Sequence, residues 1–258
     1  MARPRWLPVG SPVVVAASIA ATTLGCGGAA AMRLPEVAPH ACKPGDLADC
    51  TLQCGKHHAP SCVHLGLMYE GGRGVARDEG RAAALYKQAC DVGEAHGCSD
   101  LAFLYETGRG VDKDEARAAA LYKQACDAGE VHGCGNLGFL YETGQGVAKD
   151  QARAVALYGQ ACGADDPHGC GNLGFLYETG NGVGRDERRA VALYRQACDG
   201  GEAHGCGNLG FLYETGKGVD RDEARAGALY KQACDAGDAH ACTNLDRLRS
   251  VQPIGESR

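Results

Sequence analysis

Apolar side chains recur at helical spacing along most of the chain, in blocks that return every 36 residues. In one block, Leu137, Leu140 and Tyr141 share one face of an expected helix over residues 132–142. A second apolar stripe predicts another helix over residues 151–162. Each period therefore predicts a first and a second helix, with an apolar face that only neighbouring pairs can bury.

Glycine and aspartate mark the expected ends of these helices. Gly144 and Gly146 permit the left-handed conformations that end a helix and turn the chain. Asp150 is placed to cap the second helix by accepting backbone N–H bonds. Glycine also returns inside the first helix, as at Gly138, where it costs about 0.5–1 kcal/mol relative to alanine. Its return indicates that another helix passes close by. The same two positions in the other repeats hold Asp78, Asp114, Asp186 and Asp222, and Gly66, Ala102, Gly174 and Gly210.

Self-comparison of the sequence defines its organisation. The period contains no insertion or deletion, and a fixed period of this length is typical of a solenoid. We expect a signal peptide over 1–26, a flexible linker over 27–45, a solenoid over 46–250 and a tail over 251–258. The solenoid should comprise a truncated first unit, five full hairpins and a C-terminal capping helix.

The N-terminal segment has the pattern of an export signal. Arg3 and Arg5 precede an apolar stretch that lacks charged residues, and the stretch ends in Thr23-Leu24-Gly25-Cys26. These four residues resemble the lipobox of bacterial lipoproteins, although Thr23 departs from the usual leucine. The resemblance implies lipidation of Cys26 and a lipoprotein of the envelope, in the periplasm or at the outer membrane. Cleavage followed by plain secretion is the alternative.

Charge argues against nucleic acid as a partner. Removing residues 1–26 takes away Arg3 and Arg5, which leaves 24 basic and 32 acidic residues and a net charge of −8. Acidic and basic residues are interleaved in every repeat, which favours solvated helix faces over a steering patch. Contact with a membrane is expected only through a lipid at Cys26.

Cysteine spacing predicts a covalent framework. Fourteen of the fifteen cysteines form Cys-x7-Cys pairs, and Cys26 is the remaining one. A helix-turn-helix can bring such pairs within the Cα separation that a disulfide needs, in an oxidising compartment. The expected disulfides are Cys42-Cys50, Cys54-Cys62, Cys90-Cys98, Cys126-Cys134, Cys162-Cys170, Cys198-Cys206 and Cys234-Cys242. The first four cysteines permit three connectivities, among which the repeat register favours Cys54-Cys62.

Zinc is the competing interpretation of the cysteines. A histidine stands two residues before the second cysteine of five pairs, as His132 does before Cys134. Cys-x5-His-x-Cys is not a familiar zinc spacing, and each repeat would lack a fourth ligand. We therefore expect no metal and no other cofactor, and interpret the histidines as residues that pack at helix starts.

The stretch LGFLYETGQGVAKDQARAVALYGQAC (137–162) resembles a Sel-one-like repeat (SLR), a relative of the tetratricopeptide repeat. The added cysteine pair in each unit is similar to the bacterial secreted cysteine-rich Hcp-type proteins. This resemblance implies an all-α, right-handed superhelical solenoid of α/α units, with one disulfide per unit and a concave groove that binds partners. It also implies penicillin binding or weak β-lactamase activity as an alternative function.

The sequence contains little that suggests catalysis. No serine opens the Ser-x-x-Lys arrangement of serine β-lactamases, and nucleophile-elbow, phosphate-loop and dinucleotide motifs are absent. His57, His58, Ser61 and His64 form the one unusual polar cluster, which we interpret as a terminal cap. Near-identical repeats favour binding over a single catalytic centre, so we identify no catalytic residue.

A polar and aromatic series on the first helices is the candidate binding face. The asparagines could hold an extended peptide or a protein segment, since each amide offers a donor and an acceptor. The phenylalanines would add apolar contact. The alternative is that asparagine caps or bridges helices and that phenylalanine belongs to the core. The series comprises Asn136, Asn172, Asn208 and Asn244 with Phe139, Phe175 and Phe211, followed by Thr143, Thr179 and Thr215.

Overall fold

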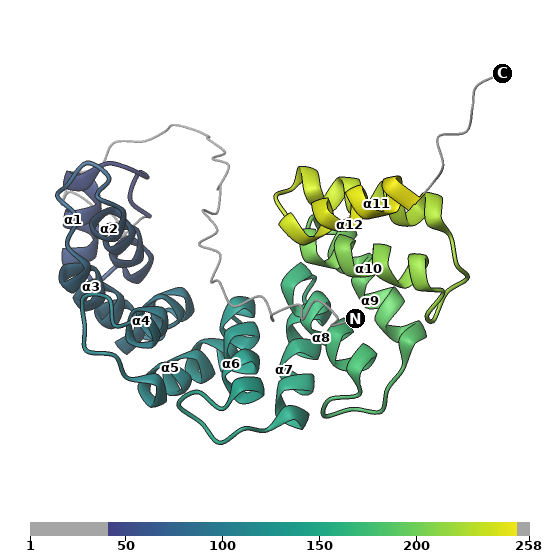
Figure 1. Ribbon diagram of the computed structural model, residues 1–258. Helices are drawn as coiled ribbons and strands as arrows, with labels where there is room; N and C mark the ends of the chain where they lie inside the picture. The colour runs from purple at the N-terminus through teal and green to yellow at the C-terminus, as the bar shows by residue number, and fades with distance from the viewer. Residues whose placement is uncertain (1–40, 252–258) are drawn as a thin grey trace, which may run out of the picture. The chain divides into compact units, whose positions relative to one another are not determined.

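The computed structural model describes residues 41–251, and every regular element in this range is an α-helix (Figure 1). The predicted signal peptide, Cys26 and most of the predicted linker and tail lie outside the described residues. None of the described helices is long and apolar enough to cross a membrane. The helices are α1 (Leu47–Gly55), α2 (Ala59–Gly71), α3 (Glu79–Asp91), α4 (Ala95–Thr107), α5 (Glu115–Asp127), α6 (Val131–Thr143), α7 (Gln151–Gly163), α8 (Pro167–Thr179), α9 (Glu187–Asp199), α10 (Ala203–Thr215), α11 (Glu223–Asp235) and α12 (Ala239–Val251).

The helices alternate between two kinds. The first helices are α2, α4, α6, α8 and α10, and the second helices are α3, α5, α7, α9 and α11. The described helices also include α1, in the register of a second helix, and α12, in that of a first helix. The chain thus forms five full hairpins between a preceding and a following helix, in an all-α solenoid.

The residues that the sequence predicts at the helix ends adopt the expected roles. Asp150 precedes α7, and its side chain accepts a hydrogen bond from the backbone N–H of Arg153. Gly144 follows α6 with φ +80°, a left-handed conformation that L side chains rarely adopt. Both devices recur in all five hairpins, with caps at Asp78, Asp114, Asp186 and Asp222 and left-handed glycines at Gly72, Gly108, Gly180 and Gly216.

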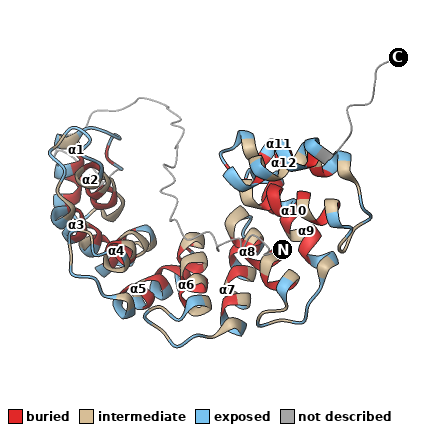
Figure 2. Cartoon of the chain, in the orientation of Figure 1, coloured by how far each residue is buried: buried red, intermediate tan, exposed pale blue. Residues whose placement is uncertain are grey.

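The described chain divides into two compact units, residues 41–128 and residues 129–251. Within each unit, the hairpins stack in series and bury the faces on which the helices meet, which are red in Figure 2. In residues 129–251, the core includes the fully buried Tyr158, Tyr194 and Tyr230 of successive second helices. Each unit is stabilised by the apolar surface that neighbouring hairpins remove from water.

The glycine inside the first helix allows the close helix contact that the sequence indicates. A Cβ atom added at Gly174 would lie 2.9 Å from Cδ1 of Tyr194, and one added at Gly210 would lie 3.0 Å from Cδ1 of Tyr230. Such separations are shorter than ordinary carbon contacts. The cost of a helical glycine is therefore offset by the packing of a buried tyrosine against the bare backbone of the neighbouring helix.

The disulfides of the repeats join the end of one helix to the start of the next, and Cys42–Cys50 joins the segment before α1 to that helix. Six of the predicted bonds have Cα–Cα separations between 4.5 and 4.8 Å, within the range of natural disulfides. They include Cys42–Cys50 and Cys54–Cys62, the pairing that the repeat register favours. Cys126 and Cys134 are disulfide-bonded too. Bonds that close loops this short contribute about 2.5 kcal/mol each in the loop-entropy picture.

The folded body begins earlier than the predicted boundary of the linker. Cys42 is 3% exposed, and its backbone N–H donates to Oγ of Ser61 at 3.1 Å. The disulfide to Cys50 holds the same residue against α1. The composition of residues 27–45 indicates a tether, but its last few residues belong to the N-terminal cap of the array.

Candidate binding face

The predicted asparagines all lie in residues 129–251, one on each of α6, α8, α10 and α12. Asn172 and Asn208 are 9% and 8% exposed, and Asn136 and Asn244 are half-buried. Among the described residues, none of the four amides has a hydrogen-bond partner. Their polar atoms are not fully enclosed, however. The amides therefore reach solvent from narrow sites between side chains.

The phenylalanines of the series have a double role. Phe139, Phe175 and Phe211 are half-buried and pack against the edge of the core of residues 129–251. Each ring thus supports the core and keeps part of its surface accessible. The threonines of the series are less available, because each hydroxyl donates to a backbone carbonyl. Thr143, for example, donates to the carbonyl of Phe139 at 2.8 Å.

The histidines stand at the starts of the first helices, and a buried carboxylate orients at least one of them. Nδ1 of His204 lies 3.0 Å from Oε1 of Glu202, whose carboxylate also accepts the backbone N–H of His204 and of Gly205. The hydrogen bond to Glu202 raises the pKa of His204. Among residues 41–251, no group of histidine, cysteine, aspartate and glutamate side chains has the arrangement of a metal site.

The polar cluster at the N-terminal end is a structural cap. Ser61 is fully buried, and its Oγ lies 2.7 Å from Nδ1 of His58 while it accepts the N–H of Cys42. Nδ1 of His64 contacts the carbonyl of Pro60 at 2.8 Å. A serine nucleophile must be reachable by its substrate, so this geometry does not suit hydrolysis.

A series of glutamates on the first helices was not predicted. In each hairpin, a buried tyrosine of the second helix donates its hydroxyl to Oε2 of the glutamate near the end of the first helix, at 2.8 to 2.9 Å. Tyrosine contributes an apolar ring and a hydroxyl that needs a partner once buried. The pairs are Tyr86–Glu70, Tyr122–Glu106, Tyr158–Glu142, Tyr194–Glu178 and Tyr230–Glu214.

These glutamates differ in their remaining contacts. Burial raises the pKa of Glu142, although the Tyr158 hydroxyl opposes that effect. Burial acts on Glu214 as well, but hydrogen bonds from Arg247 and Tyr230 hold its pKa below the ordinary value. The carboxylate of Glu214 thus has a counter-ion on α12, at 2.7 Å from the Arg247 guanidinium.

Charge is distributed unevenly between the two kinds of helix. The first helices α2, α4, α6, α8 and α10 contain no lysine or arginine, whereas α3, α5, α7, α9 and α11 all do. Basic side chains of the second helices and the turns nevertheless lie against first-helix side chains, as Arg153 does over Tyr141 and Lys217 over Phe211.

An open hollow of 740 Å³ in residues 129–251 lies away from the asparagine series. It is formed by the start of α9 and the turn before α11, and its walls include Arg185, Arg188, Glu187 and Asp220. Both signs of charge line it, so it offers no clear complement to one class of ligand.

Comparison with known proteins agrees with this fold. The model of the Sel1 repeat family matches residues 59–94, 95–130, 131–166, 167–202 and 203–238, one match per hairpin. No curated protein matches the chain at a significant level.

Solved structures of Sel1 repeat proteins are similar. A protective antigen of uropathogenic Escherichia coli with an SLR fold is 28% identical, with a TM-score of 0.72 over 78% of this chain, which spans only 43% of the antigen's length. A Sel1 repeat protein from Oxalobacter formigenes is 30% identical, with a TM-score of 0.71 over 74% of this chain and 78% of that one. Helicobacter pylori cysteine rich protein B is 31% identical over 52% of this chain and 96% of its own, with a TM-score of 0.43. With five consecutive matches over most of its length, the chain belongs to the Sel1 repeat family.

Proposed function

We propose that residues 129–251 bind an extended peptide, or an extended segment of another protein, along the row of first helices. Sel1 repeats generally mediate protein–protein interactions, and their fold is typically a non-enzymatic scaffold. The observation that carries the proposal is the asparagine series, in which the same amide lacks an internal partner on four successive first-helix positions.

The packing of residues 129–251 supports this choice of face. Successive first helices touch directly, α8 with α10 and α10 with α12, whereas the second helices pack mainly against first helices. A stack whose first helices lie closer together curves toward them. The amides would then line the concave side of this unit, where each can donate to and accept from a peptide backbone.

Replacement of Asn136, Asn172 and Asn208 by alanine tests the proposal. A peptide selected from a random library against the oxidised protein serves as the probe, with affinity measured by fluorescence anisotropy. Each lost hydrogen bond contributes about 0.5–1.5 kcal/mol, so the triple variant should bind about tenfold or more weakly. The thermal unfolding midpoint should stay unchanged.

A matched variant controls for surface changes elsewhere. It carries alanine at three exposed second-helix positions, Gln160, Asp199 and Asp235, and should bind the peptide as the native protein does. Equal affinity of the asparagine variant and this control would rule out the series as the binding surface.

The same proposal includes the cellular location of the protein. The disulfides indicate an oxidising, exported environment. A lipid at Cys26 would attach the array to a membrane of the envelope. Incorporation of a labelled fatty acid that is lost in Cys26→Ser would support the anchor, and release of unlabelled protein would favour plain secretion.

A further inference from the structure

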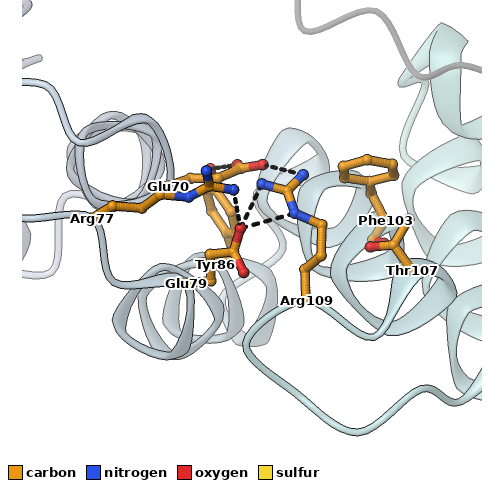
Figure 3. Close-up of polar contacts among 7 residues, drawn as sticks. All are labelled: Glu70, Arg77, Glu79, Tyr86, Phe103, Thr107 and Arg109. Atoms are coloured by element: carbon orange, nitrogen blue, oxygen red, sulfur yellow. Dashed lines mark hydrogen bonds and ion pairs between the residues drawn. The ribbon is translucent and has the colours of Figure 1, made fainter.

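In residues 41–128, the side chain of Arg109 is held by a set of side chains. An equivalent set in residues 129–251 has no arginine. Arg109, in the turn after α4, donates from Nη2 to Oε1 of Glu79 at 2.7 Å and places Nη1 3.2 Å from Oε1 of Glu70 (Figure 3). Its guanidinium lies over the ring of Phe103, 5.5 Å from the centroid. Two acidic side chains of the preceding hairpin and an aromatic ring of its own hairpin thus hold one cation.

The same site recurs two repeats later with its charges changed. Asn181 stands at the position of Arg109 and Gln151 at that of Glu79, while Glu142 and Phe175 keep the places of Glu70 and Phe103. The backbone arrangement is retained. A Cβ atom added at Gly110 would lie 2.3 Å from the backbone of Glu79, and one added at Gly182 would lie 2.5 Å from that of Gln151.

The carboxylate of Glu142 therefore lacks the cation that its equivalent has. Oε2 accepts the hydroxyl of Tyr158 at 2.9 Å, and among the described residues no arginine or lysine forms an ion pair with the side chain. Lys149, in the turn after α6, faces it only through space. The ring of Phe175 remains half-buried.

A second carboxylate in residues 129–251 shows that an arginine from a neighbouring segment suits this series. Arg247 of α12 stands at the repeat position of the phenylalanines and binds Oε2 of Glu214 at 2.7 Å. At the intervening Glu178, the position of Arg109 is held by Lys217, whose ammonium lies over Phe211. Glu142 thus differs from Glu178 and Glu214. It has no basic residue at the repeat position of Arg109 or at that of Arg247.

We propose that Glu142, Phe175, Asn181 and Gln151 form a binding site for an arginine side chain supplied by the bound partner. The inference rests on the proposed function and specifies the partner as a basic segment. The guanidinium of the partner is placed as that of Arg109 is. It forms an ion pair with the Glu142 carboxylate and lies over the ring of Phe175. The amides of Asn181 and Gln151 replace the second carboxylate. The helices α6, α8 and α10 contain no lysine or arginine, and Lys149 acts on Glu142 only through space.

Acetyl-arginine amide is the probe, used with the full oxidised chain and followed by NMR of the Glu142 carboxyl and the Phe175 ring. Saturable shifts at both groups are expected, together with a lower pKa of Glu142 in the complex. Acetyl-citrulline amide, which has the same shape without the charge, should produce neither. The affinity should fall as salt is added.

Two variants and one control define the site. Asn181→Arg should place an internal arginine on Glu142 and weaken binding of the probe about tenfold or more, as should Glu142→Gln. Asp199→Asn removes an exposed charge from α9 and should leave binding unchanged. Because Asn181→Arg adds a group without removing one, loss of binding in that variant does not depend on a damaged fold.

The alanine variant of Asn136, Asn172 and Asn208 separates this inference from the proposed function. It should still bind acetyl-arginine amide while losing the library peptide. Equal shifts with the citrulline compound, or unchanged binding by Asn181→Arg, would refute the arginine site and leave the asparagine series untouched.

Discussion

Residues 41–128 and residues 129–251 use the same hairpin, yet two equivalent carboxylates in them, Glu70 and Glu142, differ in the side chains that contact them. In the first unit, Glu70 receives both the Tyr86 hydroxyl and the Arg109 guanidinium. In the second, Glu142 receives a tyrosine hydroxyl alone. The backbone contacts of the turn are retained, so the difference comes from the side chains that surround the carboxylate. In this solenoid, one turn residue can change the surroundings of a carboxylate while the fold stays the same.

The asparagine series shows the same contrast. The equivalent first-helix positions of residues 41–128 hold His64 and Asp100 instead of asparagine. Nδ1 of His64 contacts the carbonyl of Pro60 within its own helix. Candidate recognition groups are therefore concentrated in residues 129–251, while the arginine that contacts two carboxylates, Arg109 with Glu70 and Glu79, lies in residues 41–128.

Removal of one disulfide from each unit should have the largest effect. Serine in place of both Cys90 and Cys98, or of both Cys198 and Cys206, should lower the free energy of unfolding by about 2.5 kcal/mol. Because each repeat depends on its neighbours, limited proteolysis should cut near the missing bond first. Cleavage spread evenly over both units would show that the array opens as one body, contrary to this expectation.

Loss of the tyrosine hydroxyl should distinguish the two carboxylates. Tyr158→Phe leaves Glu142 half-buried without its hydrogen bond and should cost about 1–3 kcal/mol. Tyr86→Phe should cost less, because Arg109 still binds Glu70. Urea unfolding of both variants measures the difference. Equal losses would mean that Arg109 contributes nothing to the stability of Glu70.

The contributions of Glu214 and Glu142 to stability should depend on pH in opposite directions. Glu214 has a lowered pKa, so its contribution to stability is present above the unfolded value and is lost as pH falls through the folded pKa. Glu142 has a raised pKa, so its contribution is present below the unfolded value and is lost as pH rises through the folded pKa. Carboxyl NMR titration should place the pKa of Glu142 above that of Glu214.

Arg247→Gln tests the cause of this difference. Removal of the guanidinium should move the pKa of Glu214 upward, toward the behaviour of Glu142, while Glu142 itself stays unchanged. A titration of Glu214 that is indifferent to this substitution would contradict the ion pair as the origin of the lowered pKa.

Much of the fold could be predicted because its signals are local. Asp150, Gly144 and the apolar spacing each act within one helix or turn, and the cysteine pairs lie eight residues apart. The Tyr158–Glu142 bond could not be derived in this way. It joins residues 16 apart, across two helices whose relative rotation is set by packing.

The candidate site was only partly visible in the sequence. Repetition located the asparagines, because a polar residue that returns at one helical position is easy to notice. The site around Glu142 depends instead on a departure from repetition, Asn181 in place of Arg109. Such a departure has meaning only once stacking shows which residues of neighbouring hairpins meet. The returning Tyr and Glu letters were the available signal, but neither identifies its partner.

The short sequence separation within each disulfide affects the oxidative folding of the protein. In these six disulfides, the two cysteines are eight residues apart, so both would enter an oxidising compartment almost together. A hairpin can be oxidised before the rest of the polypeptide has arrived, because the cysteines of these bonds do not depend on a partner far along the chain. Biogenesis can then proceed from the N-terminus onward with little need for an isomerase, and duplication of a whole repeat would leave the existing bonds correctly matched.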